Sequence, residues 1–275
     1  MVKNKRPIGI FDSGYGGLTV FKEIRKLIPD YDFIYLGDNA RAPYGNRSFE
    51  TVYEYTLECV KWFFDQGCPL VILACNTASA KALRTIQQKD LLFNFPEKRV
   101  LGVIRPTAEI IGQMTQTNAI GILGTMGTVN SESYKIEIAN FFPEVKVFQQ
   151  ACPAWVSYIE NGQYNGNEMD RIIQEDLEQL FSQSNNIDTI LLACTHYPLV
   201  EDKIRSFIPR GIKLISQGGI VADSLSGYLR RHDSLNNNLT KYGSVQFYTT
   251  NGVEDFEQHG ERFFGEKISA KTLHL

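Results

Sequence analysis

Two short stretches of this sequence read as copies of one another. Residues 71–79 read Val-Ile-Leu-Ala-Cys-Asn-Thr-Ala-Ser, and residues 189–198 read Thr-Ile-Leu-Leu-Ala-Cys-Thr-His-Tyr-Pro. Each stretch is an apolar run of strand length that ends at Ala-Cys and continues into small polar residues. An uninterrupted apolar run of this kind fits a parallel strand that is buried on both faces. We therefore expect two equivalent buried strands, which carry Cys75 and Cys194 at their carboxyl ends.

A second pair of matching stretches predicts that a whole unit is duplicated. Ile8-Gly9-Ile10 and Ile120-Gly121-Ile122 are each followed by one apolar residue and a small polar loop. The second copy begins 112 residues after the first, and the two cysteines lie 119 residues apart. Two independent matches with similar offsets indicate a repeat.

Strand and helix patterns alternate along the chain, which is typical of an α/β fold with parallel sheets. We expect residues 152–162 to be irregular and residues 236–238 to form a flexible turn. The expected strands are 7–11, 33–38, 70–74, 100–104, 120–123, 145–148, 187–193, 213–216, 245–250 and 268–273. The expected helices are 18–28, 48–66, 76–89, 131–141, 168–182, 200–207, 220–231 and 253–264.

The repeat also predicts how the chain divides into domains. We expect residues 1–99 together with 212–275 to form the first α/β domain and residues 100–211 the second. The C-terminal remainder is too small to be a domain and should pack on the first unit. Ligands bind at the carboxyl ends of strands in open α/β sheets. The prediction is thus two pseudo-symmetric parallel-sheet α/β domains with the active site in the cleft between them.

Composition excludes several classes of function. The chain has 275 residues, of which 43% are apolar and 21% charged, and its net charge is −3. That charge provides no attraction for nucleic acid, so we expect no nucleic-acid partner. No apolar run is long enough for a membrane span or a signal peptide, which predicts a cytoplasmic protein without membrane contact. The five cysteines form no CxxC pair or zinc-binding spacing, so we expect free thiols and no metal.

Two cysteines on facing strand ends can handle one carbon atom from both sides. One takes a proton as thiolate and the other delivers a proton as thiol, which inverts a stereocentre. A redox pair is the competing interpretation, but a substrate between the cysteines would hold their Cα atoms beyond the ~7 Å that a disulfide allows. A single cysteine is more often a small core residue, and Cys59 and Cys68 fit that description.

Each cysteine needs a polar assistant. His196 follows Cys194 by two residues, and Asp12 ends a strand that we expect beside the strand of Cys75. The competing interpretation is that Asp12 only caps the helix that follows. Glu160 lies in the expected irregular loop and could face the cleft. Hydroxyl and amide side chains suited to holding carboxylate and ammonium groups are Asn76, Thr77, Thr125, Thr128 and Thr195.

These motifs resemble those of the glutamate racemases, cofactor-independent enzymes that make D-glutamate for peptidoglycan. The resemblance runs from about Pro7 to Phe264. The matching motifs are Asp12-Ser13-Gly14-x-Gly16-Gly17-Leu18-Thr19-Val20, Pro43-Tyr44-Gly45, Ala74-Cys75-Asn76-Thr77-Ala78, Cys152-Pro153, Glu160-x-Gly162 and Ala193-Cys194-Thr195-His196-Tyr197-Pro198.

The resemblance implies a 1,1-proton transfer in which Cys75 takes the α-proton of D-glutamate and Cys194 that of L-glutamate. Asp12, His196 and Glu160 would assist these two cysteines. Neither pyridoxal phosphate nor a metal is implied, and the family is commonly homodimeric. The residues implied in substrate binding are Asp12, Ser13, Tyr44, Gly45, Asn76, Thr77, Thr125, Thr128, Thr195 and His196.

Four residues depart from the family pattern, and three alternative functions stay open. Tyr15 replaces a small aliphatic residue, Arg105 a common Glu, and Ala154-Trp155 a more usual Leu-Phe. An aspartate racemase would use the same chemistry, but Cys-Thr-His rather than Cys-Thr-Glu argues against it. A non-catalytic amino-acid-binding protein needs no matched cysteines. A decarboxylase of the superfamily typically keeps one of the two.

Overall fold

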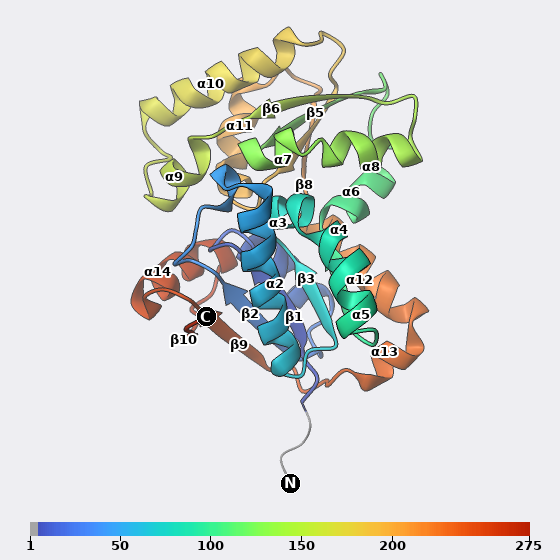
Figure 1. Ribbon diagram of the computed structural model, residues 1–275. Coiled ribbons are helices and arrows are strands. Elements are labelled where there is room, and N and C mark those ends of the chain that lie inside the picture. Colours follow the sequence, from blue (N-terminus) through green and yellow to red (C-terminus); the bar gives the residue numbers. More distant parts are fainter. Residues whose placement is uncertain (1–4) are drawn as a thin grey trace.

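The computed structural model describes residues 5–275, so residues 1–4 of the first predicted domain lie outside the described part. It contains two parallel sheets that lie one above the other in Figure 1, with helices on the faces of each. The larger sheet contains β1 (Ile8–Asp12), β2 (Phe33–Gly37), β3 (Leu70–Leu73), β4 (Arg99–Gly102), β9 (Val245–Thr249) and β10 (Ala270–Thr272). The smaller sheet contains β5 (Ala119–Gly124), β6 (Lys146–Ala151), β7 (Thr189–Ala193) and β8 (Lys213–Ser216). We call each sheet with its helices the first and the second domain.

The helices account for most of the remaining chain. Those before the second sheet are α1 (Leu18–Leu27), η1 (Tyr44–Asn46), α2 (Phe49–Asp65), α3 (Asn76–Lys81), α4 (Leu83–Thr85), the π-helical η2 (Ile86–Leu91), α5 (Leu92–Asn94) and α6 (Ile104–Ile111). Those within the second domain are α7 (Met126–Asn130), α8 (Ser133–Phe141), α9 (Trp155–Glu160), α10 (Asn167–Ser182), η3 (Tyr197–Val200) and α11 (Glu201–Phe207). The C-terminal helices are α12 (Gly218–Arg231), α13 (Asp233–Asn238) and α14 (Val253–Phe264).

The strand order repeats between the sheets, which confirms the predicted α/β class with two parallel-sheet units. The first sheet has the order β10-β9-β2-β1-β3-β4 and the second β6-β5-β7-β8, so the four-strand pattern β2-β1-β3-β4 recurs. Even the register is shared, because Gly9 pairs with Val71 and Gly121 pairs with Ile190. Each of these partners precedes its cysteine by four residues.

The two repeated glycines permit close helix packing at equivalent places. A Cβ atom on Gly9 would lie 2.7 Å from Phe63 of α2, and one on Gly121 would lie 2.8 Å from Leu180 of α10. A larger residue at either position would push the covering helix off its sheet. The Ile-Gly-Ile repeat is therefore a packing requirement of both units.

The predicted domain boundaries are wrong by one strand each. β4 pairs with β3 in the first sheet, although residues 100–211 were expected to form the second domain. β8 pairs with β7 in the second sheet, although residues 212–275 were assigned to the first. The chain crosses between the sheets after Gly102 and after Ser216, so each repeated unit keeps its fourth strand beside its third.

Several expected elements also differ in detail. The stretch expected to be irregular contains α9, which the fully buried Trp155 anchors in the second domain. The flexible turn expected at 236–238 is the end of α13, where Asn236 accepts a hydrogen bond from Tyr31 at 2.6 Å. The strand expected at 100–104 ends at Gly102, and the helix expected at 76–89 continues in short segments to Asn94.

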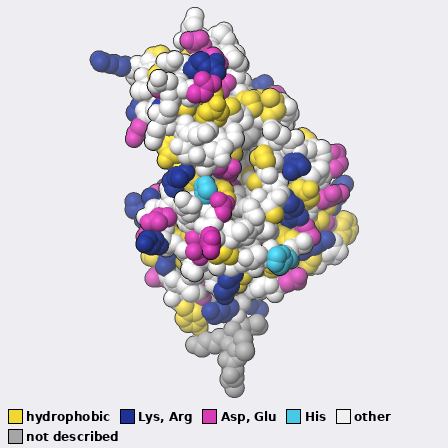
Figure 2. Space-filling model, turned by 90° about the vertical axis from the view of Figure 1, so that its left-hand side faces the viewer, with side chains coloured by type: hydrophobic (Ala, Val, Ile, Leu, Met, Phe, Trp, Pro, Cys, Tyr) yellow, Lys and Arg dark blue, Asp and Glu magenta, His cyan; other side chains and the backbone are white. Residues whose placement is uncertain are grey.

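The distribution of charged side chains on the surface agrees with the small net charge of the sequence. On the face shown in Figure 2, acidic and basic side chains are interspersed over both domains, without a large patch of one sign. Within residues 5–275, no helix combines the length and apolarity needed to cross a membrane.

Candidate active site

The two repeated cysteines line one cavity of about 200 Å³ between the domains. Cys75 follows β3 of the first sheet and Cys194 follows β7 of the second, and each side chain is only 5% exposed. Each domain therefore contributes one of the two repeated cysteines. The lining residues are Ser13, Pro43, Tyr44, Gly45, Asn46, Cys75, Asn76, Thr77, Thr125, Met126, Cys152, Pro153, Val156, Ser157, Glu160, Cys194, Thr195 and His196.

Cys75 is held by neutral hydrogen-bond donors. It caps α3, where its Sγ accepts from the Ala78 N–H at 3.4 Å, and Ser13 Oγ lies 3.4 Å from the same sulfur. Burial raises the pKa of the Cys75 thiol to about 12, and the negative charge of Asp12 adds to this, while Ser13 and Ala78 oppose it. Without substrate, Cys75 is thus a neutral thiol near pH 7 and is ready to give a proton.

Cys194 has a charged partner instead. His196 Nδ1 lies 3.8 Å from the Cys194 sulfur, and His196 Nε2 lies 2.8 Å from Oε1 of Glu160. Burial alone would lower the pKa of His196, but hydrogen bonds to Cys194 and Glu160 outweigh it and raise this pKa to about 10. His196 is therefore an imidazolium near pH 7, and it places a positive charge beside the Cys194 sulfur.

The two halves of the cavity thus differ in their polar partners although the strands that carry them are equivalent. The Cys75 half holds a neutral thiol beside Ser13, and the Cys194 half holds a sulfur beside the imidazolium of His196. A carbon acid bound between them would meet one cysteine from each domain, and two such groups are what stereochemical inversion needs.

Asp12 lies behind the cavity and does not line it. Its side chain is fully buried, and it accepts hydrogen bonds from the Gly14 N–H at 2.9 Å and from Thr195 Oγ1 at 3.5 Å. Burial raises the pKa of this carboxyl, whereas His196 lowers it. Asp12 was expected to assist Cys75, but its hydrogen bonds come from Gly14 in the turn after β1 and from Thr195 in the loop of Cys194, and Ser13 is the residue that contacts Cys75.

The glycine-rich turn after β1 allows Asp12 and the Cys194 loop to pack closely against it. A Cβ atom on Gly16 would come under 3.0 Å from both Thr195 and His196, and one on Gly17 would do the same to Asp12. These glycines let the start of α1 lie against the Cys194 loop of the other domain. Thr19 strengthens the contact by donating to the Thr195 carbonyl at 2.8 Å.

Most residues expected to bind substrate line the cavity. Thr77 Oγ1 and Thr125 Oγ1, from different domains, lie 2.9 Å apart across it. Thr128 does not line the cavity, because it is buried within α7 with Oγ1 3.1 Å from Thr125 Oγ1. The expected residues on the lining are Ser13, Tyr44, Gly45, Asn76, Thr77, Thr125, Thr195 and His196.

The Asn76 side chain belongs to a closed ring of buried hydrogen bonds. Its Nδ2 donates to Gln217 Oε1 at 2.7 Å, Gln217 Nε2 donates to Tyr134 at 2.6 Å, and the Tyr134 hydroxyl donates to Asn76 Oδ1 at 2.6 Å. Gln217 also donates to Thr107 at 2.9 Å and to the Val103 carbonyl at 3.3 Å. Gln217 and Val103 are next to the two points where the chain changes sheets, so this ring ties an active-site amide to both crossings.

Sequence analysis missed part of the lining. Val156 and Ser157 were not expected, and they share one face of α9 with the predicted Glu160, at a helical spacing that was overlooked because the stretch was taken as irregular. Cys152 and Pro153 were noted only as a motif. Gln217 and Tyr134 carried no signal of their own in the sequence.

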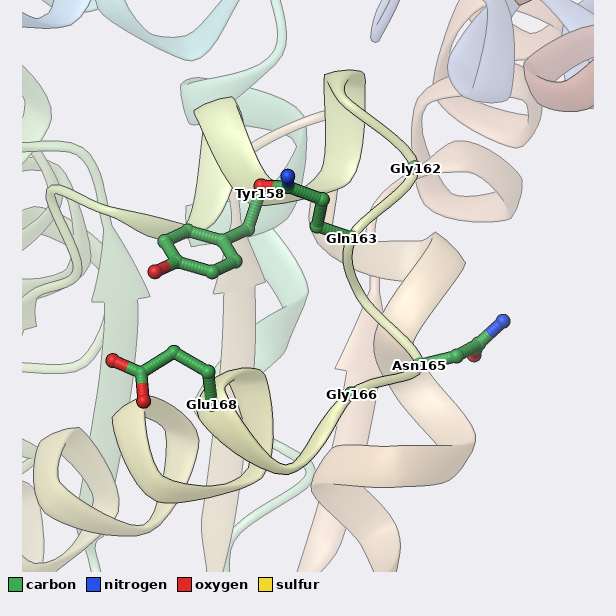
Figure 3. A pocket seen from close by; sticks show the side chains of 6 residues that line it. All are labelled: Tyr158, Gly162, Gln163, Asn165, Gly166 and Glu168. Atoms are coloured by element: carbon green, nitrogen blue, oxygen red, sulfur yellow. The ribbon is translucent and has the colours of Figure 1, made fainter.

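A second hollow of about 460 Å³ lies outside this site. Figure 3 shows Tyr158 and Gln163 on one side of it, Glu168 on the other, and Asn165 pointing away. It contains none of the predicted site residues. In the described part of the chain all five cysteines are free thiols, and no group of three or more His, Cys, Asp or Glu side chains is placed to hold a metal ion.

Comparisons with known proteins agree with this geometry. The sequence profile of the Asp/Glu/hydantoin racemases matches residues 14–224. A glutamate racemase from Enterococcus faecalis is 36% identical over 275 residues, which are 100% of this chain and 98% of that protein. A glutamate racemase from Listeria monocytogenes is 38% identical over 253 residues, or 92% of each chain.

The chain is also similar to solved structures of glutamate racemases. A glutamate racemase isoform from Bacillus anthracis superimposes with a TM-score of 0.88 at 33% identity, with 98% of both chains covered. One from Francisella tularensis, solved in complex with D-glutamate, gives a TM-score of 0.86 at 31% identity, again over 98% of both chains. The fold, the duplicated cysteine strands and these matches together lead to one assignment: the chain belongs to the Asp/Glu/hydantoin racemase family.

Proposed function

We propose that the protein interconverts L- and D-glutamate by a two-base 1,1-proton transfer without a cofactor. The observation that carries this proposal is the pair of cysteines at equivalent strand ends of two different sheets, both lining one cavity and each with its own polar partner, Ser13 for Cys75 and His196 for Cys194. The relatives that match the whole chain are named glutamate racemases, and one structural relative is described with D-glutamate bound.

In the L-to-D direction, the Cys194 thiolate removes the α-proton and becomes a thiol. The carbanion then takes a proton from the Cys75 thiol on its other face, which leaves Cys75 as thiolate and yields D-glutamate. In the D-to-L direction, the same two transfers run in reverse. Ser13 Oγ and the Ala78 N–H are in place to stabilise the Cys75 thiolate when it forms.

Apart from His196, the cavity offers neutral donors for the two carboxylates of a small amino acid. Among its described lining residues, none is Lys or Arg, whereas hydroxyl and amide groups are numerous. Hydrogen bonds to a charged ligand are the stronger kind, so several neutral donors can replace a cation. We assign Ser13, Asn76, Thr77, Thr125 and Thr195 to this role, with Tyr44 and Gly45 shaping the wall.

The proposal is tested by incubating the enzyme with each L-amino acid in D₂O and following α-deuterium and optical rotation. Glutamate should exchange and racemise. Exchange with aspartate but not glutamate would transfer the assignment to aspartate racemase. Binding of glutamate without any exchange would indicate a binding protein.

Single cysteine variants test the two-base step. Cys75→Ala or Cys194→Ala should abolish racemisation while leaving glutamate binding largely intact, because each removes one of the two proton carriers. Cys68→Ala is the matched control, since Cys68 is also fully buried but does not line the cavity. Racemisation at the wild-type rate by either active-site variant would end the two-base mechanism.

The same activity implies a cellular role and setting. We propose that the D-glutamate supplies peptidoglycan synthesis in the cytoplasm and that the protein acts as a homodimer. Depletion of the protein should make growth dependent on added D-glutamate. Sedimentation velocity should give the mass of two 31.2 kDa chains, and a single-chain mass would refute the dimer.

A further inference from the structure

The C-terminal helix α14 touches the Cys194 half of the site from outside the cavity. His259 of α14 lies with Nε2 2.9 Å from the backbone carbonyl of Glu160. Glu160 is the last residue of α9, so its carbonyl lies at a helix end, where carbonyls lack partners within the helix. In Figure 1, α14 of the first domain lies directly below α9 of the second. The hydrogen bond therefore joins the two domains.

His259 is held in place by the unusual residue Tyr15. The two rings stack with centroids 4.5 Å apart and an interplanar angle of 21°. The Tyr15 hydroxyl donates to the carboxylate of Asp255, and His259 Nδ1 lies 2.9 Å from the Asp255 carbonyl and 3.3 Å from its carboxylate. Both ring nitrogens of His259 thus face oxygen acceptors, and the N–H of the ring can donate to one of them.

One turn further along α14, Phe263 contacts the catalytic cluster itself. Its ring meets the ring of His196 edge-on at 5.3 Å and 81°. His259 fixes the backbone of Glu160, Glu160 Oε1 bonds His196 Nε2 at 2.8 Å, and His196 Nδ1 faces Cys194. The hydrogen bonds to Cys75 come instead from Ser13 and Ala78, which α14 does not provide.

We propose that His259, supported by Tyr15, is a positioning residue for the Cys194 half-reaction alone. It holds the end of α9 so that Glu160 keeps His196 aligned and charged beside Cys194. This proposal rests on the proposed racemase function. It also gives Tyr15, a departure from the family pattern, a physical role as the platform for the His259 ring.

An effect on the Cys194 step alone needs a measurement that separates this step from the Cys75 step. Enantiomers have equal free energies, so the racemisation equilibrium constant is one and kcat/KM must be equal in both directions whatever the variant. The α-deuterium isotope effect is free of this constraint. If the Cys194 step becomes slower, it limits both directions, so the isotope effect should rise with L-[2-²H]glutamate, which Cys194 deprotonates. It should fall with D-[2-²H]glutamate, which Cys75 deprotonates.

The test compares three variants of the full-length enzyme. His259→Phe keeps a ring to stack on Tyr15 but removes the donor, and kcat should fall about tenfold, the size of one well-placed hydrogen bond. His259→Gln keeps an N–H donor and should recover much of the loss. His232→Phe is the matched control, because His232 also stacks on a tyrosine, Tyr228 at 4.0 Å, and faces a carbonyl at 2.8 Å, but lies on a different part of the surface.

Opposite changes of the two isotope effects in His259→Phe, with wild-type values in His232→Phe, would support the proposal. Isotope effects that stay at wild-type values in both directions would overturn it, even if activity falls. If His259→Phe does not fold, as judged by circular dichroism, Tyr15→Val provides the same comparison with a smaller expected shift. A wild-type enzyme that does not racemise glutamate would instead refute the proposed function.

Discussion

Removing the Tyr134 hydroxyl should loosen the active site and the domain crossings together. Tyr134→Phe deletes two hydrogen bonds of the buried ring, one to Asn76 and one from Gln217, both 2.6 Å long. Each is worth about 1 kcal/mol net, and the Asn76 oxygen left without its donor adds a desolvation penalty. Gln217 keeps its bond to Thr107, which limits the loss. We therefore expect the free energy of unfolding to fall by about 2–3 kcal/mol.

The functional effect should be on substrate binding more than on chemistry. Asn76 lines the cavity, and without Tyr134 its amide can rotate away from the orientation that the ring imposes. We expect KM for glutamate to rise about fivefold to tenfold with a smaller change in kcat, since neither thiol is touched. Urea unfolding and steady-state kinetics measure both quantities.

The control for this variant is Tyr31→Phe. Tyr31 also donates through its hydroxyl at 2.6 Å, to Asn236, but it is only partly buried and remote from the cavity. Its loss should cost no more than about 1 kcal/mol and leave KM unchanged. If Tyr134→Phe is no less stable than Tyr31→Phe and keeps the wild-type KM, the ring has no part in holding Asn76.

Two further predictions follow from the site. The pKa of His196 is raised to about 10 against an ordinary 6.5, so its contribution to stability is complete below pH 6.5 and disappears as pH rises through 10. The urea midpoints of wild type and His196→Asn should therefore differ most near pH 6 and converge by pH 10. A difference between the midpoints that widens as pH rises would contradict a raised pKa of His196. Gly16→Ala should lower stability by about 1–3 kcal/mol and reduce activity, because its Cβ would collide with Thr195 and His196. Gly219→Ala, with open space around it in α12, should be neutral or stabilising, and equal effects of the two alanines would contradict the packing argument.

The features that sequence analysis predicted best are those with strong local patterns. The strands before Cys75 and Cys194 are fully buried, so their uninterrupted apolar runs were distinctive. The repeat then predicted two equivalent thiols at the ends of parallel strands. Both expectations depend on burial and periodicity, which a sequence records directly.

The domain boundaries were missed because a strand pattern does not say which sheet the strand joins. β8 is only partly buried, and β4 begins at an exposed Arg99. The repeat does indicate which sheet each strand joins, since β4 and β8 begin at residues 99 and 213, an offset close to those of the other matches. Extending the repeat to its fourth strand would have put both strands in the correct sheet.

Side-chain partners across the domain interface were the least predictable part. Asp12 was correctly expected beside the strand of Cys75, but the direction of its carboxylate depends on Gly17 and Thr195, which are distant in sequence or lack a side chain. Gln217 shows no feature in the sequence that separates it from a surface glutamine. Its role appears only when both chain crossings meet at one buried point.

The most direct test of the account is a crystal structure of the enzyme with D-glutamate bound. We expect the sulfur atoms of Cys75 and Cys194 on opposite faces of the α-carbon, each about 3.5 Å from it, the separation that proton transfer requires. Both sulfur atoms on the same face, or either one out of reach of the α-carbon, would contradict the two-base mechanism.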